Sequence, residues 1–278
     1  MPLKIILPLL LFFVLMSCDK TKTTYYENGK LKLIYNLNSF GKKEGLEKIF
    51  YPNGQILSLI NYENGVWIDS IVKFDNDKAI ASILKKDNGV FVLKNFTKGV
   101  VDSEGKVDSL LRPIGWWLFY KNHKVYKTEE KIIVENQSIT NRRNIYQDSK
   151  IDSIRSDFYT LAIPSAIIKD KQYSFKLKYH FDETGEDKNL LGKTYYFLMM
   201  SNAINDDFSN LNRITLDTFV PIQKGEFIYN LGFRTVGDKK IRGIIEKSTM
   251  VNKNGKLIIT KSRLFINEKL KIALQPLE

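Results

Sequence analysis

Tyr51-Pro52-Asn53-Gly54, with the run Gln55-Ile56-Leu57-Ser58-Leu59-Ile60 that follows it, decides the fold of this chain. The Asn-Gly pair favours a type I′ β-turn, because both of its residues tolerate the positive φ angles that this turn requires. Apolar and polar residues alternate beside the pair, as in strands with one buried face. The segment therefore predicts a β-hairpin.

The same pattern occurs three times in the first quarter of the chain. The copies are Tyr26-Glu27-Asn28-Gly29, Tyr51-Pro52-Asn53-Gly54 and Tyr62-Glu63-Asn64-Gly65, and Gly41-Lys42-Lys43-Glu44-Gly45 lies between the first two. Gly29 and Gly54 are 25 residues apart. A fixed period in this range indicates a repeat array.

These residues resemble the short bacterial variant of MORN repeats. The best match runs from Tyr25 to Trp67, and a degenerate continuation covers residues 72–75 and 115–120. The resemblance implies stacked β-hairpins that form an elongated sheet with aromatic residues on its inner face. It also implies a scaffold or binding surface and no catalysis. Residues 76–112 fit the pattern poorly, so the continuity of the array stays open.

The N-terminus resembles a bacterial lipoprotein signal. Lys4 precedes an apolar stretch at residues 5–14, and Leu15-Met16-Ser17-Cys18 holds the only cysteine. The apolar stretch is shorter than the roughly 20 residues that a membrane-spanning helix needs. The resemblance implies cleavage after a signal peptide of residues 1–17 and diacylation of Cys18, followed by a lipidated linker of residues 18–24. The alternative is an ordinary signal peptide with a chance cysteine.

Two β-rich modules are expected after the linker. The first covers residues 25–150 and holds the repeats. Residues 138–156 are polar and mark a boundary, and residues 157–278 form the second module. Its expected strands are 158–163, 172–181, 194–200, 213–220, 227–233, 240–247, 256–266 and 270–274. This number of short strands predicts an antiparallel, immunoglobulin-like β-sandwich, so the chain as a whole is expected to be all-β.

Aromatic side chains supply the candidate binding residues. Trp67, Trp116, Trp117 and Tyr120 stack on a sugar or peptide if they are exposed and pack in the core if they are not. Trp116 and Trp117 are adjacent in an expected strand, so they point to opposite faces and at least one of them is exposed.

The residue inventory argues against most catalytic chemistry. Cys18, the only cysteine, is expected to be acylated, and His123 and His180 are the only histidines. Thiolate metal sites and Cys–His pairs are therefore not expected, and neither is a cofactor. Gly192-Lys193-Thr194 resembles the end of a phosphate-binding loop. Six residues separate Gly185 from Gly192 where such a loop has four, and a strand is expected where the loop requires a helix. Acidic residues in two loops leave calcium as an alternative. They are Asp182, Glu183, Glu186, Asp187, Asp206 and Asp207.

The net charge of +12 is spread along the chain and forms no block, which argues against nucleic acid as a partner. We expect a non-catalytic scaffold or binding module for a protein or glycan. We expect it to be lipid-anchored in the cell envelope, at the outer membrane, on its periplasmic face or at the cell surface. The alternatives are an enzyme that acts on envelope polysaccharide, through a pair of carboxylates without a local motif, and a subunit of a secretion or motility machinery.

Overall fold

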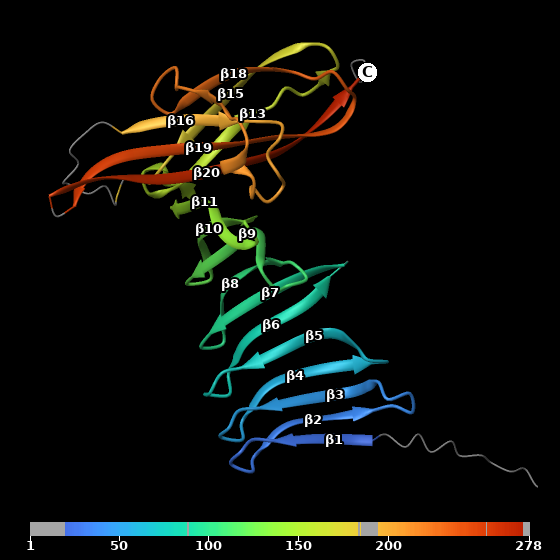
Figure 1. Ribbon diagram of the computed structural model, residues 1–278. Coiled ribbons are helices and arrows are strands. Elements are labelled where there is room, and N and C mark those ends of the chain that lie inside the picture. Colours follow the sequence, from blue (N-terminus) through green and yellow to red (C-terminus); the bar gives the residue numbers. More distant parts are fainter. Residues whose placement is uncertain (1–19, 88, 183, 185–193, 254, 275–278) are drawn as a thin grey trace, which may run out of the picture. The chain divides into compact units, whose positions relative to one another are not determined.

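The computed structural model describes residues 20–87, 89–182, 184, 194–253 and 255–274 (Figure 1). The described chain is all-β, as predicted, with two short 3-10 helices at Ser153–Arg155 and Leu211–Arg213. It divides into two compact units. Unit 1 comprises Met1–Lys86 and Phe96–Gly99, and unit 2 comprises Asp87–Asn95 and Val100–Glu278.

Unit 1 is built from antiparallel hairpins whose strands lie side by side in sequence order (Figure 1). Its strands are β1 (Lys20–Tyr25), β2 (Leu31–Leu37), β3 (Lys43–Phe50), β4 (Ile56–Glu63), β5 (Val66–Phe74) and β6 (Ile80–Asp87). The predicted strands on either side of Gly54 are thus confirmed as β3 and β4.

The turn that decides the fold differs in type from the prediction. Tyr51 accepts a hydrogen bond from the Gly54 amide at 2.9 Å, and of the pair Asn53–Gly54 only Gly54 has a positive φ, +91°. This is a type I turn closed by one left-handed residue, with a register shift at Ile49/Phe50. The type I′ prediction is wrong here and at Gly29, where Asn28 also has a negative φ. It is confirmed at Asn64–Gly65, where both φ angles are positive.

Two turns begin with a tyrosine whose hydroxyl hydrogen-bonds a backbone carbonyl oxygen about one repeat later. Tyr26 Oη donates to the carbonyl oxygen of Phe50 at 2.5 Å, and Tyr51 Oη donates to that of Phe74 at 2.8 Å. The donor and acceptor are 24 and 23 residues apart, which is close to the repeat period. The tyrosines therefore join successive repeats through the backbone and not only through apolar packing.

One face of unit 1 carries a charged pair among aromatic rings. Lys43 Nζ lies 4.9 Å from the ring centroid of Tyr35 and 4.8 Å from that of Tyr62, and it pairs with the buried Glu47. Burial alone would lower the pKa of Lys43, but the hydrogen bond and charge of Glu47 outweigh it and raise the pKa. The rings of Tyr35 and Tyr62 therefore make cation–π contacts with Lys43.

Residues 76–112 form strands although the repeat pattern fades. β6 is followed by β7 (Val90–Thr97) and β8 (Val100–Val107), and the sheet order of the described strands runs without interruption from β1 to β12. The turns at Lys78 and Leu111 close with these residues at φ values of 65° and 61°. In each turn an aspartate stands where Asn38 stands in an earlier turn, and its carboxylate accepts two backbone amides.

In unit 2 the hairpin sheet ends with four strands. They are β9 (Pro113–Lys121), β10 (Lys124–Val134), β11 (Gln137–Gln147) and β12 (Lys150–Ile151). The stretch that was predicted to be a polar boundary, residues 138–156, holds β11 and β12. Its polar side chains bind other strands of unit 2: the Asn141 amide bonds both the carbonyl oxygen and the amide of Phe265, at 2.8 and 2.6 Å.

Two smaller sheets follow and share one core. The first contains β13 (Phe158–Ala162), β15 (Gln172–His180) and β18 (Glu226–Gly232). The second contains β14 (Ile167–Ile168), β16 (Tyr195–Met200), β17 (Asp217–Phe219), β19 (Gly237–Lys253) and β20 (Lys256–Ala273). Fully buried Phe175, Leu177 and Phe227 of the first sheet pack in the same cluster as Leu198 and Ile245 of the second. The sheets form a curled half-barrel.

Three details of the predicted second module need correction. β14 pairs with β20 in parallel, so the module is not wholly antiparallel. Residues 256–266 and 270–273 belong to one strand. Glu268, between them, stays on the core face, where it accepts a hydrogen bond from Tyr159 Oη at 2.8 Å. Most of 213–220 is irregular, and only Asp217–Phe219 forms a strand.

We expect Gly54→Val to destabilise unit 1 by about 1–3 kcal/mol, because a β-branched residue resists the left-handed conformation. No heavy atom lies within 4 Å of an added Cβ, so the loss is conformational and not steric. Gly54→Asn should cost less, because asparagine tolerates this region. Hydrogen exchange of β3 and β4 measures the effect. Equal protection in both variants would contradict the turn assignment.

Candidate functional site

The predicted aromatic residues do not form one site. Trp67 lies on β5 in unit 1, whereas Trp116, Trp117 and Tyr120 lie on β9 in unit 2. Cys18 and residues 1–17 lie outside the described residues, as do Glu183, Glu186, Asp187 and the Gly192–Lys193 segment.

The two adjacent tryptophans face opposite sides of β9, as predicted. Trp116 is 42% exposed and Trp117 only 4%. Trp117 Nε1 donates to the carbonyl oxygen of Lys106 at 3.0 Å, and the ring packs flat against Gly105, where a Cβ would lie 2.4 Å from it. Trp117 is therefore a core residue and cannot contact a ligand in this conformation.

Trp116 and Tyr120 have partners within the chain. The Arg142 guanidinium carbon lies 5.2 Å from the Trp116 ring centroid, and both guanidinium bonds to Glu130 measure 2.6 Å. Tyr120 Oη donates to Glu104 at 2.5 Å, and this hydrogen bond raises the pKa of Tyr120 to about 12. Of the three predicted binding residues on β9, Trp116 alone keeps a large exposed surface.

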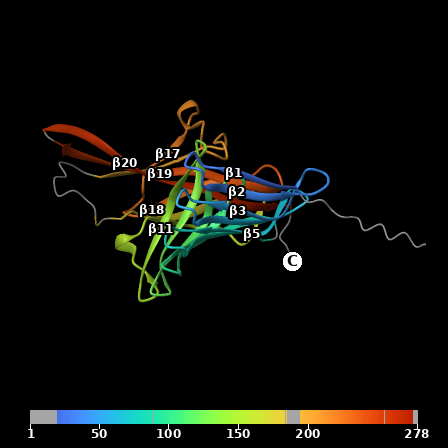
Figure 2. The same ribbon diagram turned by 90° about the horizontal axis from the view of Figure 1, so that it is seen from below.

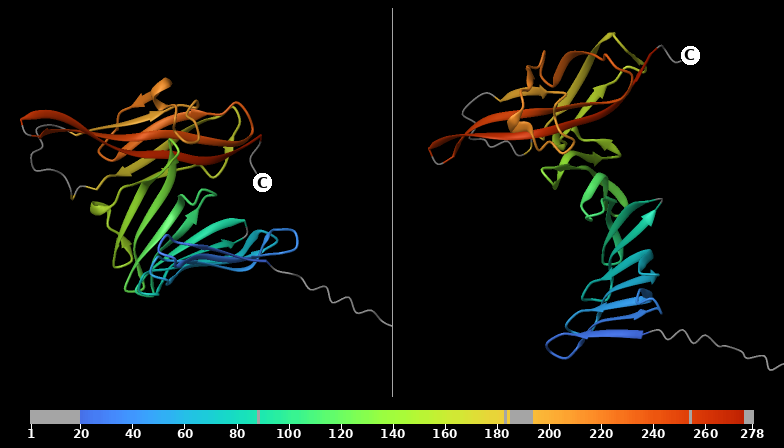
Figure 3. Two further views of the ribbon diagram at one scale, coloured as in Figure 1. Left: turned by 60° about the horizontal axis from the view of Figure 1, so that its bottom comes forward. Right: turned by 45° about the vertical axis from the view of Figure 1, so that its right-hand side comes forward.

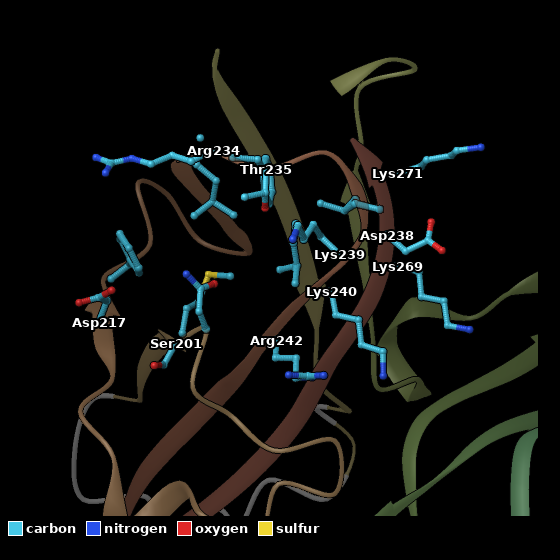
Figure 4. Close-up of a pocket in the computed structure, with 18 residues that line it drawn as sticks. Ser201, Asp217, Arg234, Thr235, Asp238, Lys239, Lys240, Arg242, Lys269 and Lys271 are labelled. Atoms are coloured by element: carbon cyan, nitrogen blue, oxygen red, sulfur yellow. The ribbon is translucent and has the colours of Figure 1, made fainter. Parts of the chain in front are cut away.

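Unit 2 contains a cavity of about 1150 Å³ (Figure 4). It lies between β17 and β18, which are edge strands of the two smaller sheets, and beside β19 and β20. Its apolar wall is made by side chains from five segments of the chain. They are Met200, Phe219, Leu231, Phe233, Ile241 and Leu270.

Basic side chains dominate the charged part of the cavity wall. The basic residues are Arg234, Lys239, Lys240, Arg242, Lys269 and Lys271, and the acidic residues are Asp217 and Asp238. Figure 4 shows them spread around the cavity, with Arg234 and Asp217 on one side and Lys269 and Lys271 extending on the other. Such a wide ring of charge suits a ligand with several anionic groups better than a single small anion.

Two of these cations share one carboxylate, and the other four have no carboxylate partner among the described residues. Lys240 Nζ lies 2.9 Å from Asp206, and Arg242 pairs with the same carboxylate. The hydrogen bond from Lys240, together with the positive charge of Arg242, lowers the pKa of Asp206. The other four basic residues of the wall form no ion pair with a described residue, so their charge remains available to a ligand. They are Arg234, Lys239, Lys269 and Lys271.

A second, smaller cavity of about 280 Å³ has aromatic walls. Tyr179, Phe181 and Tyr196 line it together with His180. The Tyr179 hydroxyl is buried and has no hydrogen-bond partner among the described residues, and burial raises the pKa of Tyr179 to about 12. Aromatic walls with a few polar groups are typical of small-molecule sites.

The acidic residues proposed for calcium are engaged elsewhere where they are described. Asp182 accepts from Arg143 at 2.7 Å and from Thr184, and Asp207 accepts from Ser209. Burial alone would raise the pKa of Asp182, but these bonds outweigh it and lower the pKa. Among the described residues no group of three or more His, Cys, Asp or Glu side chains lies together as a metal site would require.

Sequence reasoning missed the large cavity. Its wall comes from residues 200–202, 217–219, 231–235, 238–242 and 269–271, which carry no common motif. The run Asp238-Lys239-Lys240 together with Lys269 and Lys271 was a usable signal, since both lie near the ends of expected strands in one basic module.

We expect Trp117→Ala to lower the free energy of unfolding of unit 2 by about 3–5 kcal/mol, because it empties a packed core position. Trp116→Ala, the matched control, should lose only the cation–π contact, about 0.5–1 kcal/mol. Thermal denaturation of the two variants measures the difference. Equal losses would mean that Trp117 is not the core residue.

Residues 19–38 and 43–64 match the model of the MORN repeat variant, which covers the hairpins β1–β4. This finding supports the repeat prediction for that part of the chain. The comparison with curated proteins gives no match. Within the described residues, no helix has the length and apolar character needed to cross a membrane.

Proposed function

We propose that the chain is a lipoprotein of the cell envelope, anchored through Cys18 at the outer membrane, and that it binds a partner and does not catalyse a reaction. The apolar N-terminus that ends at Leu15-Met16-Ser17-Cys18 supports the anchor. The repeat match at residues 19–64 supports a scaffold, because repeat sheets offer extended binding surfaces. We propose in addition that the two C-terminal sheets are immunoglobulin-like.

The cavity between β17 and β18 carries the binding proposal. It combines an apolar wall with cations that have no carboxylate partner among the described residues. An apolar wall suits the ring faces of sugars, and the cations suit carboxylate or phosphate substituents. Of the two partner classes, a protein or a glycan, the cavity therefore favours an anionic glycan.

The binding proposal is tested with the chain from Asp19 onward, which contains every described residue. We expect it to bind oligogalacturonate more tightly than neutral oligosaccharides of equal length. The double variant Arg234→Glu/Lys239→Glu should lower this affinity by about tenfold or more, because it replaces attraction with repulsion. Isothermal titration calorimetry at two salt concentrations measures both effects.

Lys121→Glu/Lys150→Glu is the matched control, because it makes the same change of net charge at exposed residues outside the cavity. An equal loss of affinity in both double variants would mean that the binding depends on the overall charge of the chain and not on the cavity. Equal affinity for neutral and acidic oligosaccharides would contradict the proposal that the cavity prefers an anionic glycan.

The anchor has its own test. Labelled palmitate should mark the wild-type chain and not Cys18→Ala, because acylation requires the thiol. Crosslinking in intact cells then compares the proteins captured by the two forms. Specific capture of one envelope protein by the wild type would favour a scaffold for a protein partner, or a machinery subunit, over a glycan-binding module. Labelling of both forms would exclude Cys18 as the lipid site.

An enzyme that acts on envelope polysaccharide is the second candidate, and one observation favours it. Asp217 and Asp238 both line the cavity, on opposite sides in Figure 4. Glycosidases use two carboxylates that flank the scissile bond. Release of reducing ends from an acidic polysaccharide, with loss of release in Asp217→Asn and Asp238→Asn, would replace the binding proposal with this one.

A further inference from the structure

The hairpin of β19 and β20 places positive charges directly opposite one another. The two paired strands are drawn in orange-red and red in Figures 2 and 3. Lys240 of β19 lies in register with Lys269 of β20, so both side chains lie on the same face of the hairpin. Arg242 and Lys271 follow them by two residues each and share that face, with Asp238 opposite Lys271. Like charges in directly opposite positions destabilise a sheet, so an anion beside Lys240 stabilises this one.

Asp206 supplies that anion from the loop between β16 and β17. Lys240 Nζ lies 2.9 Å from both oxygens of the Asp206 carboxylate, and Arg242 pairs with the same carboxylate. Arg242 also donates to the carbonyl oxygen of Ile204 at 2.7 Å. Lys240 and Arg242 line the cavity, and Asp206 does not (Figure 4). Two cations of the cavity wall are therefore paired with a carboxylate that belongs to the chain itself.

Buried residues on both sides of Asp206 hold the loop in place. Ile204 and Phe208 are each 1% exposed, and they pack in one cluster with Ile244 and Phe265. Phe208 has a φ of +58°, a conformation that a bulky residue keeps only where its surroundings fix it. The position of Asp206 is therefore set by its buried neighbours and does not depend on its ion pairs.

The carboxylate of Asp206 is open to water, although its two partners are largely covered. The Asp206 side chain is 66% exposed, against 32% for Lys240 and 19% for Arg242. An ion pair with such an exposed member contributes little stability, because water and salt screen it. A ligand with several carboxylates binds the unpaired cations of the cavity wall at the same time. Such a ligand therefore competes effectively with one exposed carboxylate for Lys240 and Arg242.

We infer that Asp206 is a specificity-determining residue of the cavity: it is an internal anion that occupies Lys240 and Arg242 in the free chain and competes there with an anionic glycan. This role rests on the proposed binding of such a glycan in the cavity. It assigns the preference for charged over neutral sugars in part to a residue outside the cavity wall. Asp206 lowers the affinity for an anionic ligand and leaves the affinity for a neutral one unchanged.

The test measures binding of oligogalacturonate, and of a neutral oligosaccharide of equal length, to the chain from Asp19 onward by isothermal titration calorimetry. We expect Asp206→Asn to raise the affinity for oligogalacturonate about three- to tenfold, because it removes a negative charge beside two cations and keeps the size of the side chain. The affinity for the neutral oligosaccharide should stay the same. Asp207→Asn is the matched control. It makes the same change of charge one residue away, where the carboxylate accepts from Ser209 and forms no ion pair with a described residue.

A second pair of variants tests whether Asp206 acts through Lys240. Lys240→Gln should lower the affinity for oligogalacturonate only slightly in the wild-type chain, because Asp206 already occupies this lysine. The same change should lower the affinity several-fold in the Asp206→Asn chain, where the lysine is free to contact the ligand. Circular dichroism checks that each variant is folded.

Amine labelling gives a readout that needs no glycan. We expect Lys240 to react with an amine-specific acetylating reagent faster in Asp206→Asn than in the wild type, because the carboxylate no longer holds the ammonium group. Mass spectrometry measures the labelled fraction, with exposed Lys121 as the reference. Added oligogalacturonate should protect Lys240 more strongly in Asp206→Asn than in the wild type.

The outcomes separate this role from the proposed function. Unchanged affinity in Asp206→Asn, or an equal rise in Asp206→Asn and Asp207→Asn, overturns the role of Asp206 and leaves the proposed glycan binding intact. A lower affinity in Asp206→Asn also overturns it, because Asp206 would then position the two cations for the ligand. If neither the wild type nor Asp206→Asn binds oligogalacturonate, the proposed function fails and the role of Asp206 fails with it.

Discussion

The hairpin sheet depends on one backbone constraint: each turn closes with a residue in the left-handed conformation. Gly29, Gly54 and Lys78 close three turns in this way after a type I turn, and each closure is followed by a shift in strand register. Other hairpins use two left-handed residues, as at Asn64–Gly65 and Asn122–His123. Hairpins of the second kind shift register too, at Ile60/Asn61 and at Val125/Lys127, so these bulges help to set which side chains of the next strand face each side.

The sequence predicts this constraint where the closing residue is glycine and conceals it elsewhere. Asn-Gly pairs identify the hairpins of β1–β5 because few other residues accept a positive φ. At Lys78 and Leu111 the turn is held by Asp75 and Asp108, whose carboxylates bond backbone amides two and four residues later. That signal is a single acidic residue, which is too common to identify a turn from one sequence, so the pattern does not predict the strands between 76 and 112.

The second half of the chain shows a different limit. Alternation identifies β15, β16 and β18 within a residue or two, because one face of each is buried. The polarity of residues 138–156 misleads, because the side chains of Asn141, Arg142 and Arg143 bind other segments of unit 2. The cavity has no signal in any one segment, because its wall is assembled from five segments that only the fold brings together.

The tyrosine bonds between successive turns restrict how such a chain changes its length. Tyr26 reaches the carbonyl of Phe50 and Tyr51 reaches that of Phe74, at separations that match one hairpin pair. Insertion of a single residue between donor and acceptor would reverse the faces of a strand and move the carbonyl away from the hydroxyl. Insertion of a whole hairpin pair preserves both. Sheets of this kind therefore grow and shrink in evolution by duplication or loss of complete repeats.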